Sequence, residues 1–171
     1  MVLTPTLWRT SRVLGGPSRL NLLRHILGGG APCVTELAAA AGLSEPRASQ
    51  ELRRLQARGL VRAERQGRYL IYRPVPDPKV PSAKPLLAAA RSALAGRPDA
   101  ETLHVARAFG HDRRLTIVRT LRRGPQPARN LPAATGIPEP ALFRHLRVLQ
   151  AGGVVRRTRT GWELAPTRPP P

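Results

Sequence analysis

The sequence predicts a mainly α-helical protein with small β-hairpins, folded as two consecutive copies of one unit. Three observations support this prediction. Apolar residues recur mostly at helical spacing, two short alternating segments follow a helix that ends at glycine, and both patterns return further along the chain. Hydrophobic residues make up 41% of the 171 positions and aromatic residues only 4%, so the cores must consist of Leu, Val, Ile and Ala.

The first copy is predicted to contain three helices. The first is marked by four apolar residues and ends at the glycines at 28–30. A short second helix has Thr35 as its expected N-cap and ends at Gly42, because glycine adopts the left-handed conformation that a tight turn needs. Ser44 is expected to cap the third helix, which ends at Gly59. The apolar residues of the first helix are Leu20, Leu23, Ile26 and Leu27.

The third helix carries a buried stripe of Ala48, Leu52 and Leu55, and Pro46 is tolerated in its first turn. Two alternating segments follow, 60–65 and 68–73, and they flank Gln66-Gly67, which predicts a β-hairpin. A helix, a helix–turn–helix and a hairpin in this order form a winged helix-turn-helix domain, in which the hairpin is the wing.

The second copy repeats the first at a fixed distance. Gly42 matches Gly136 and Gly59 matches Gly153, both at an offset of 94 positions. Shared Glu-Pro, Leu-x-x-Leu-Gln and Val-Arg positions accompany these glycines, so the chain is a tandem duplication. The copy has the stripe Leu142, Leu146 and Leu149, the expected cap Asn130 ahead of Pro132, and a hairpin tip at Thr160-Gly161.

Between the copies, the segment 74–85 carries five prolines and is expected to be extended. An Ala-rich helix at 86–94 and a further helix at 98–110 follow, with Leu103 and Ala106 facing inward. The proline-rich tail is expected to be disordered. The predicted division is a first domain at 1–79, a Pro-rich connector with a short helix at 80–97, a second domain at 98–165 and a tail at 166–171.

The chain is strongly basic, with 29 Lys and Arg against 10 Asp and Glu and a net charge of +19. Only two of the basic residues are lysines. Such charge favours a polyanionic partner, either nucleic acid or an anionic membrane surface. A membrane-surface helix needs aromatic anchors beside its basic residues, whereas Trp8 and Trp162 lie far apart. Because no signal peptide or run of 18 apolar residues is present, we expect a soluble, cytoplasmic protein.

Double-stranded DNA is the predicted partner, because the third helix of such a domain enters the major groove. Arg recognises guanine, Gln recognises adenine, and Ser contacts bases or phosphates. Wing arginines hold phosphates or enter a narrow minor groove. Glu51 repels phosphate unless it accepts a hydrogen bond from cytosine, and Phe143 contacts a thymine methyl or caps the local core. The predicted DNA contacts are Arg47, Ser49, Gln50, Arg53, Arg54, Arg65 and Arg68 in the first copy, and Phe143, Arg144, His145, Arg147, Arg157 and Arg159 in the second.

The sequence resembles the ArsR family of bacterial winged-helix regulators. Residues 14–24 and 109–119 are similar to that family's first-helix signature, and residues 43–73 are similar to its recognition helix and wing. The resemblance implies transcriptional repression and DNA binding that is released by an effector, commonly by a dimer joined through terminal helices.

Two motifs depart from that family. Many metal-sensing members carry Cys-Val-Cys-Asp-Leu, where this chain has Cys33-Val-Thr-Glu-Leu. A lone thiol cannot make a multi-thiolate site, so neither a metal nor a cofactor is expected. Cys33 is then an ordinary small buried residue, or alternatively a redox thiol. The family's Ser-x-His-Leu is kept only in part, as Ser49-Gln-Glu-Leu and Phe143-Arg-His-Leu, which predicts that the copies recognise different half-sites.

The predicted function is that of a sequence-specific transcriptional regulator, a repressor, whose two domains act as a pseudo-dimer within one chain. They would occupy consecutive major grooves about 34 Å apart, and a homodimer is the alternative. Two other functions stay open: a protein-interaction module of a chromosome-organising complex, and a non-specific architectural DNA-binding protein.

No enzyme is expected. The four histidines share no helical face or metal-ligand spacing, and Gly28-Gly-Gly lacks the Lys-Ser/Thr of a phosphate-binding loop. The histidines are His25, His104, His111 and His145.

Overall fold

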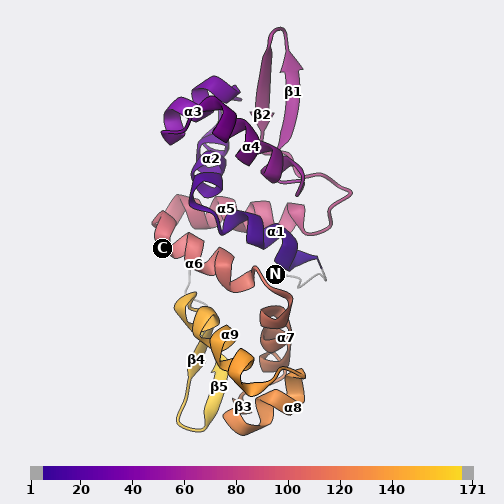
Figure 1. Ribbon diagram of the computed structural model, residues 1–171, viewed down its shortest axis with the longest axis vertical. Helices are drawn as coiled ribbons and strands as arrows, with labels where there is room; N and C mark the ends of the chain where they lie inside the picture. Colours follow the sequence, from indigo (N-terminus) through magenta and orange to yellow (C-terminus); the bar gives the residue numbers. More distant parts are fainter. Residues whose placement is uncertain (1–5, 167–171) are drawn as a thin grey trace.

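The computed structural model describes residues 6–166, which form an elongated molecule with a helix–turn–helix unit at each end and three helices between them (Figure 1). The predicted fold, mainly α-helical with two tandem winged helix-turn-helix units and small hairpins, is confirmed. Of the tail predicted to be disordered at 166–171, residues 167–171 lie outside the described residues, as do residues 1–5.

The unit at one end, called the first head, follows the predicted order. It consists of α2 (Pro17–Leu27), α3 (Val34–Ala41), α4 (Glu45–Gln56) and the antiparallel hairpin of β1 (Arg62–Gln66) and β2 (Tyr69–Arg73). Ala48, Leu52 and Leu55 of α4 are buried as predicted, and Ser44 occupies the N-cap position but makes no side-chain cap hydrogen bond.

Three boundaries in the first head differ from the prediction. Cys33, not Thr35, is the N-cap of α3, because the Cys33 backbone N–H donates to Glu36 Oε2 (2.8 Å) in a capping box. α4 ends at Gln56, and Gly59 instead supplies a left-handed residue (φ +67°) in the turn that follows. The hairpin turn is Gly67-Arg68, one residue later than expected, because Gln66 still pairs with Tyr69.

The second head consists of α7 (Asp112–Leu121), the strand β3 (Gln126–Pro127), a 3-10 turn (Ala128–Asn130), α8 (Leu131–Thr135), α9 (Glu139–Ala151), β4 (Val155–Arg157) and β5 (Gly161–Leu164). Its three strands pair in the order β3-β5-β4.

Two predicted details of the second head change. Asn130 precedes α8 as expected but makes no side-chain cap hydrogen bond. The wing turns at 158–160 and not at Thr160-Gly161, because Gly161 belongs to β5 and pairs with Pro127. A Cβ at Gly161 would stand 2.1 Å from the Gln126 carbonyl oxygen, so only glycine fits beside β3.

The duplication is visible in the backbone. α4 and α9 begin at equivalent residues, Glu45 and Glu139. Gly42 and Gly136 have φ of +63° and +67°, and Gly59 and Gly153 have +67° and +65°. The same left-handed turns therefore shape both copies, as the glycine offset predicted.

A scaffold layer of α1 (Leu7–Leu14), α5 (Ala83–Gly96) and α6 (Asp99–Phe109) joins the heads. The prediction of an extended segment through 85 and a short helix at 86–94 is wrong in extent. The chain is irregular only through 82, and α5 then packs four apolar residues into the core of the first head. These residues are Leu86, Leu87, Ala90 and Leu94.

α6 contributes to both hydrophobic cores. Ala106 is buried in the core of the first head, Ala108 in the core of the second, and Phe109 packs against both. α6 is therefore shared between the heads, whereas the predicted division placed it in the second domain alone.

Removal of an α5 side chain tests whether this helix belongs to the core. Leu87→Ala is expected to lower the free energy of unfolding by about 2–5 kcal/mol, because Leu87 is only 5% exposed and its loss leaves a cavity. Urea denaturation followed by circular dichroism measures the change. Arg91→Ala on the exposed side of α5 is the control and should change stability by less than about 0.5 kcal/mol. Equal effects of the two substitutions would mean that α5 links the heads without packing into the core.

Candidate nucleic-acid interface

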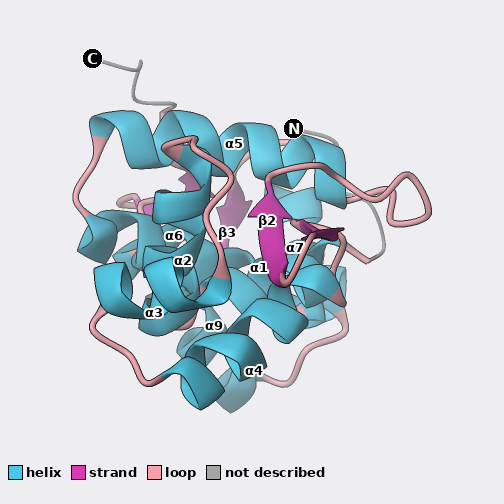
Figure 2. Cartoon of the chain, turned by 90° about the horizontal axis from the view of Figure 1, so that it is seen from above, coloured by secondary structure: helices cyan, strands magenta, loops and turns pink. Residues whose placement is uncertain are grey.

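The two predicted recognition helices, α4 and α9, lie on the same side of the molecule. Figure 1 shows both toward the viewer, and Figure 2, seen from above, shows both on the side opposite α5. The two wings project toward opposite ends of the long axis. A single elongated face therefore presents both recognition helices, with a wing at each end.

On the first recognition helix, Arg47, Gln50 and Arg53 are exposed and Ser49 is half-buried. These four residues line one open depression together with Ser44 and Pro46 at the start of α4. Four of the five residues predicted on α4 are thus brought together on one surface with exposed arginine and amide donors, whereas Arg54 lines a different hollow. Such groups can form bidentate hydrogen bonds with purine edges.

Glu51 also lines this depression, but its carboxylate is engaged within the protein. It is 6% exposed and forms ion pairs with Arg19 Nη1 (2.7 Å) and Arg54 Nη1 (2.9 Å). Burial alone would raise the pKa of the Glu51 carboxyl, but the hydrogen bonds and charges of the two arginines outweigh burial and lower the pKa. Glu51 therefore joins α4 to α2, and one nitrogen of Arg54 is already engaged.

The first wing carries aromatic and apolar surface beside its arginines. Arg65 and Arg68 are exposed as predicted. Arg68 Nη2 donates to Tyr69 Oη (2.7 Å), and its guanidinium lies 4.9 Å from the Tyr69 ring centre. Tyr69 is 48% and Leu70 42% exposed. Their exposure was not predicted. The strand pattern could have indicated it, because adjacent residues on a strand point to opposite faces, and the rest of the protein cannot cover both faces of a two-stranded wing.

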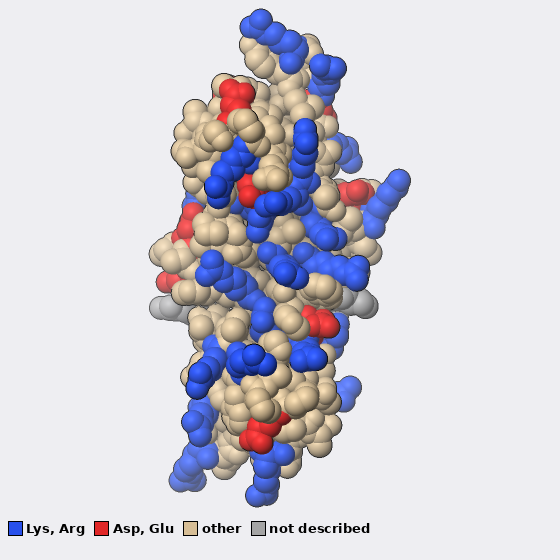
Figure 3. Space-filling view, in the orientation of Figure 1, with Lys and Arg blue, Asp and Glu red and all other residues tan. Residues whose placement is uncertain are grey.

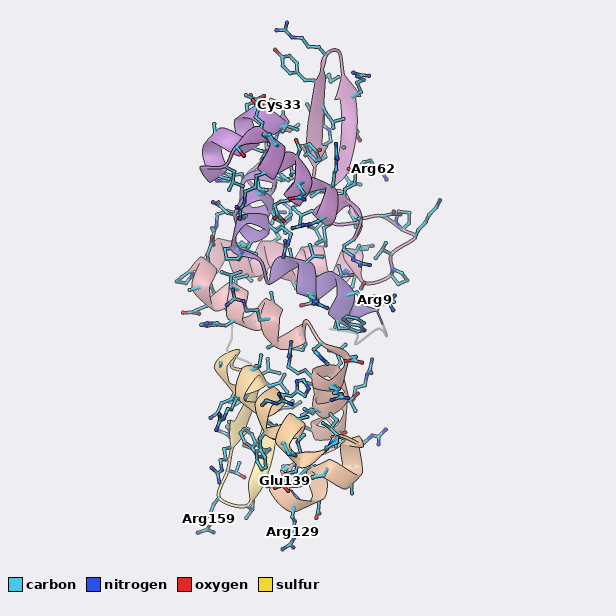
Figure 4. All side chains as sticks on the ribbon, viewed as in Figure 1. Arg9, Cys33, Arg62, Arg129, Glu139 and Arg159 are labelled. Atoms are coloured by element: carbon cyan, nitrogen blue, oxygen red, sulfur yellow. The ribbon has the colours of Figure 1, made fainter. Side chains whose placement is uncertain are left out.

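On the second recognition helix, Arg144 and Arg147 are exposed, and Phe143 is 38% exposed. Arg157 and Arg159 of the second wing are exposed as well. Figure 4 shows Arg159 and Arg129 projecting from the far end of the second head, and Arg62 on the first wing. Arg129 was not predicted as a contact, because the 3-10 turn that carries it has no counterpart in the first copy.

His145 differs from its predicted position on an open face. It is half-buried, and its ring centre lies 4.6 Å from that of His111, the N-cap of α7. The sequence showed no shared face for these histidines, because the contact joins two helices that are distant in the chain. His111 Nδ1 accepts a hydrogen bond from the Arg113 backbone N–H (3.2 Å).

Burial, followed by the charges of the neighbouring His111 and three arginines, lowers the pKa of His145 to about 4. The pKa of His111 is also lowered, first by burial, although Asp112 acts in the opposite direction. The arginines that face His145 are Arg113, Arg114 and Arg144, and Arg12 faces His111. His145 is therefore neutral at pH 7.

The face as a whole is basic. Figure 3 shows Lys and Arg distributed from one end to the other in the orientation of Figure 1, with few acidic residues among them. Several carboxylates are neutralised within the protein, so they do not offset the remaining arginines. The pairs are Glu51 with Arg19 and Arg54, Glu64 with Arg73, Asp99 with Arg24, and Glu163 with Arg156.

Cys33 is partly exposed and caps α3, so the expectation of a buried cysteine is wrong (Figure 4). Among residues 6–166, no group of three or more His, Cys, Asp or Glu side chains is arranged to hold a metal ion. Within the same range, no helix is long and apolar enough to cross a membrane.

Comparisons with known proteins find a similar family for each head. Residues 16–68 match the model of the MarR family, and residues 111–157 match that of the bacterial regulatory proteins of the arsR family. The HTH-type transcriptional regulator NmtR of Mycobacterium tuberculosis (strain ATCC 25618 / H37Rv) is 41% identical over 63 residues, which are 37% of this chain and 52% of that protein. This chain thus spans about half the length of that relative. No solved structure matches the chain.

Acidification is expected to destabilise the second head between about pH 6.5 and pH 4. The folded state keeps His145 neutral down to about pH 4, whereas the unfolded imidazole binds a proton below about 6.5. The contribution of His145 to the free energy of unfolding is therefore fully present above pH 6.5 and is lost as the pH falls toward 4. Urea midpoints measured across this range should change less in His145→Gln than in the unsubstituted protein.

His104→Gln is the control for this measurement, because His104 lies exposed on α6. This variant should keep the full pH dependence. An identical dependence in His145→Gln and the unsubstituted protein would show that the histidine pair does not couple protonation to folding.

Proposed function

We propose that this chain, which consists of two tandem winged helix-turn-helix domains of the ArsR and MarR type, is a sequence-specific regulator of transcription that places both heads on one DNA duplex. The observation that carries the proposal is the common face of α4 and α9, with exposed arginines on each helix and a wing at each end. The matches of both heads to families of bacterial regulators support it.

The arrangement suits duplex DNA for a geometric reason. Helix-turn-helix dimers bind half-sites one helical turn apart, about 34 Å, because both recognition helices must enter the major groove from one side. Here the scaffold layer takes the place of a dimer interface, and α6 packs into both cores. We therefore propose that one chain acts as a pseudo-dimer, in preference to a homodimer.

The two heads are proposed to recognise different half-sites. α4 offers Ser49 and Gln50 where α9 offers Phe143 and Arg144. Gln pairs with adenine and Arg with guanine, while an exposed Phe contacts a thymine methyl. The resulting operator would be an imperfect palindrome. The resemblance to ArsR-type repressors favours repression as the outcome of binding.

Substitution of one arginine on each recognition helix tests the proposal. Arg53→Ala and Arg147→Ala are each expected to weaken binding to DNA from upstream of the chain's own coding region by about 5- to 150-fold, because each loses a base contact worth about 1–3 kcal/mol. Mobility-shift titrations against this DNA and against random duplex measure the loss. Arg91→Ala on α5, on the opposite side, should bind normally.

The outcomes separate the three functions. Equal affinity for upstream and random DNA, with no loss in either variant, would overturn the proposal and favour an architectural protein. The absence of any DNA binding would favour a protein-interaction module.

A further inference from the structure

We propose that a third DNA contact lies between the heads, formed by a central basic patch of Arg9 and Arg12 on α1 and Arg58 after α4. Its ligand is the phosphate backbone of the duplex between the two half-sites. This inference rests on the proposed function, since it assumes that one duplex crosses both heads.

The packing of α1 forces these arginines outward. Leu7, Thr10, Ser11 and Leu14 recur at helical spacing and are all buried. The Ser11 hydroxyl donates to the Ala106 carbonyl of α6 (2.9 Å), and the hydroxyls of Thr10 and Ser82 lie 2.8 Å apart. α1 is thus anchored along one whole face. Arg9 and Arg12 are exposed on the other face, and Trp8 lies half-buried against the core.

These arginines line a hollow between α1 and the end of α4. The hollow has a volume of about 590 Å³, and no carboxylate is among the residues that line it. Its principal members are Trp8, Arg9, Arg12, Arg19, Arg54 and Arg58. A concave surface with five guanidinium groups concentrates positive potential, which attracts a polyanion.

The three arginines of the central basic patch are not neutralised within the protein. Arg19 and Arg54 each engage Glu51, whereas Arg9, Arg12 and Arg58 form no ion pair in the described part of the chain. Arg9 lies 5.3 Å from the Trp8 ring centre, a stacking contact that orders the guanidinium and leaves its N–H groups available. Like charges held together without counter-ions are unfavourable, and phosphates would relieve this repulsion.

Arg12 also reaches the second head. Its Cα would lie 3.1 Å from a Cβ placed on Gly110, at the junction of α6 and α7, and its charge acts on His111 and Arg114 of α7. The central basic patch therefore begins at the end of α4 and continues to the start of α7. In Figure 3 a band of Lys and Arg crosses the middle of the molecule, and Figure 4 shows Arg9 at this level.

A DNA duplex that receives both recognition helices in its major groove must pass α1 and the central basic patch. When two helices occupy successive major grooves on one side, the minor groove between them faces the centre of the protein. The phosphates that flank this minor groove are then the nearest anionic groups to α1. Such contacts add affinity without sequence preference.

The double variant R9A/R12A tests the inference through the salt dependence of binding. If both arginines neutralise phosphates, the slope of log K against log salt should become less steep by about 2, because each contact contributes about 0.9. Affinity should fall by the same factor, about tenfold or more, for upstream and random duplex. The variant K84A/R91A removes equal charge from exposed positions of α5 and should keep the slope.

An unchanged slope in R9A/R12A, with native circular dichroism, would overturn the inference. Restoration of the slope in R9K/R12K would support it, because lysine keeps the charge. A different result would contradict the proposed function, namely equal affinity of the unsubstituted chain for upstream and random DNA. The slope on random duplex still tests the central basic patch in that case.

Discussion

The packing of α6 between two hydrophobic cores is the interaction on which the arrangement of the heads depends. Ala106 is buried on one side and Ala108 on the other, so neither head can rotate without losing apolar contact with this helix. The contact with α9 is close: a Cβ at Gly152 would stand 2.6 Å from Ala108 Cβ. Because close-packed interfaces resist deformation, the distance between α4 and α9 is set by the scaffold layer.

Hydrogen bonds at the junction of α6 and α7 reinforce this packing. Arg114 donates to the carbonyls of Ala108 (2.8 Å) and Arg107 (2.7 Å), and Arg107 Nε donates to Gly15 O (3.1 Å). These arginines serve the structure, whereas Arg47 and Arg53 of α4 and Arg144 and Arg147 of α9 are exposed. Division of the basic residues between the two tasks explains how a chain with net charge +19 both folds and presents an anion-binding face.

Much of the fold followed from local signals in the sequence. The stripe of Ala48, Leu52 and Leu55 located α4, and the paired glycines located the turns of both heads, because periodicity and left-handed turns are properties of short segments. α1 was missed although Leu7, Thr10, Ser11 and Leu14 carry a helical pattern, since two of these four are polar and appear exposed until their hydroxyl partners are known.

The features of the interface that could not be predicted depend on long-range contacts. Glu51 is on the recognition helix, but only the fold shows that Arg19, 32 positions away, draws it inward. His111 and His145 meet because α7 and α9 pack together. Sequence spacing on one helix identifies which residues share a face, whereas the direction that this face takes is decided by the neighbouring helices.

The central claim is that one chain places two heads on one duplex, and footprinting combined with the mass of the complex tests it most directly. Hydroxyl-radical footprinting of upstream DNA should show two protected segments about one helical turn apart, and native mass spectrometry of the same complex should show one chain per duplex. A single protected segment, or two protected segments that require two chains, would contradict the claim.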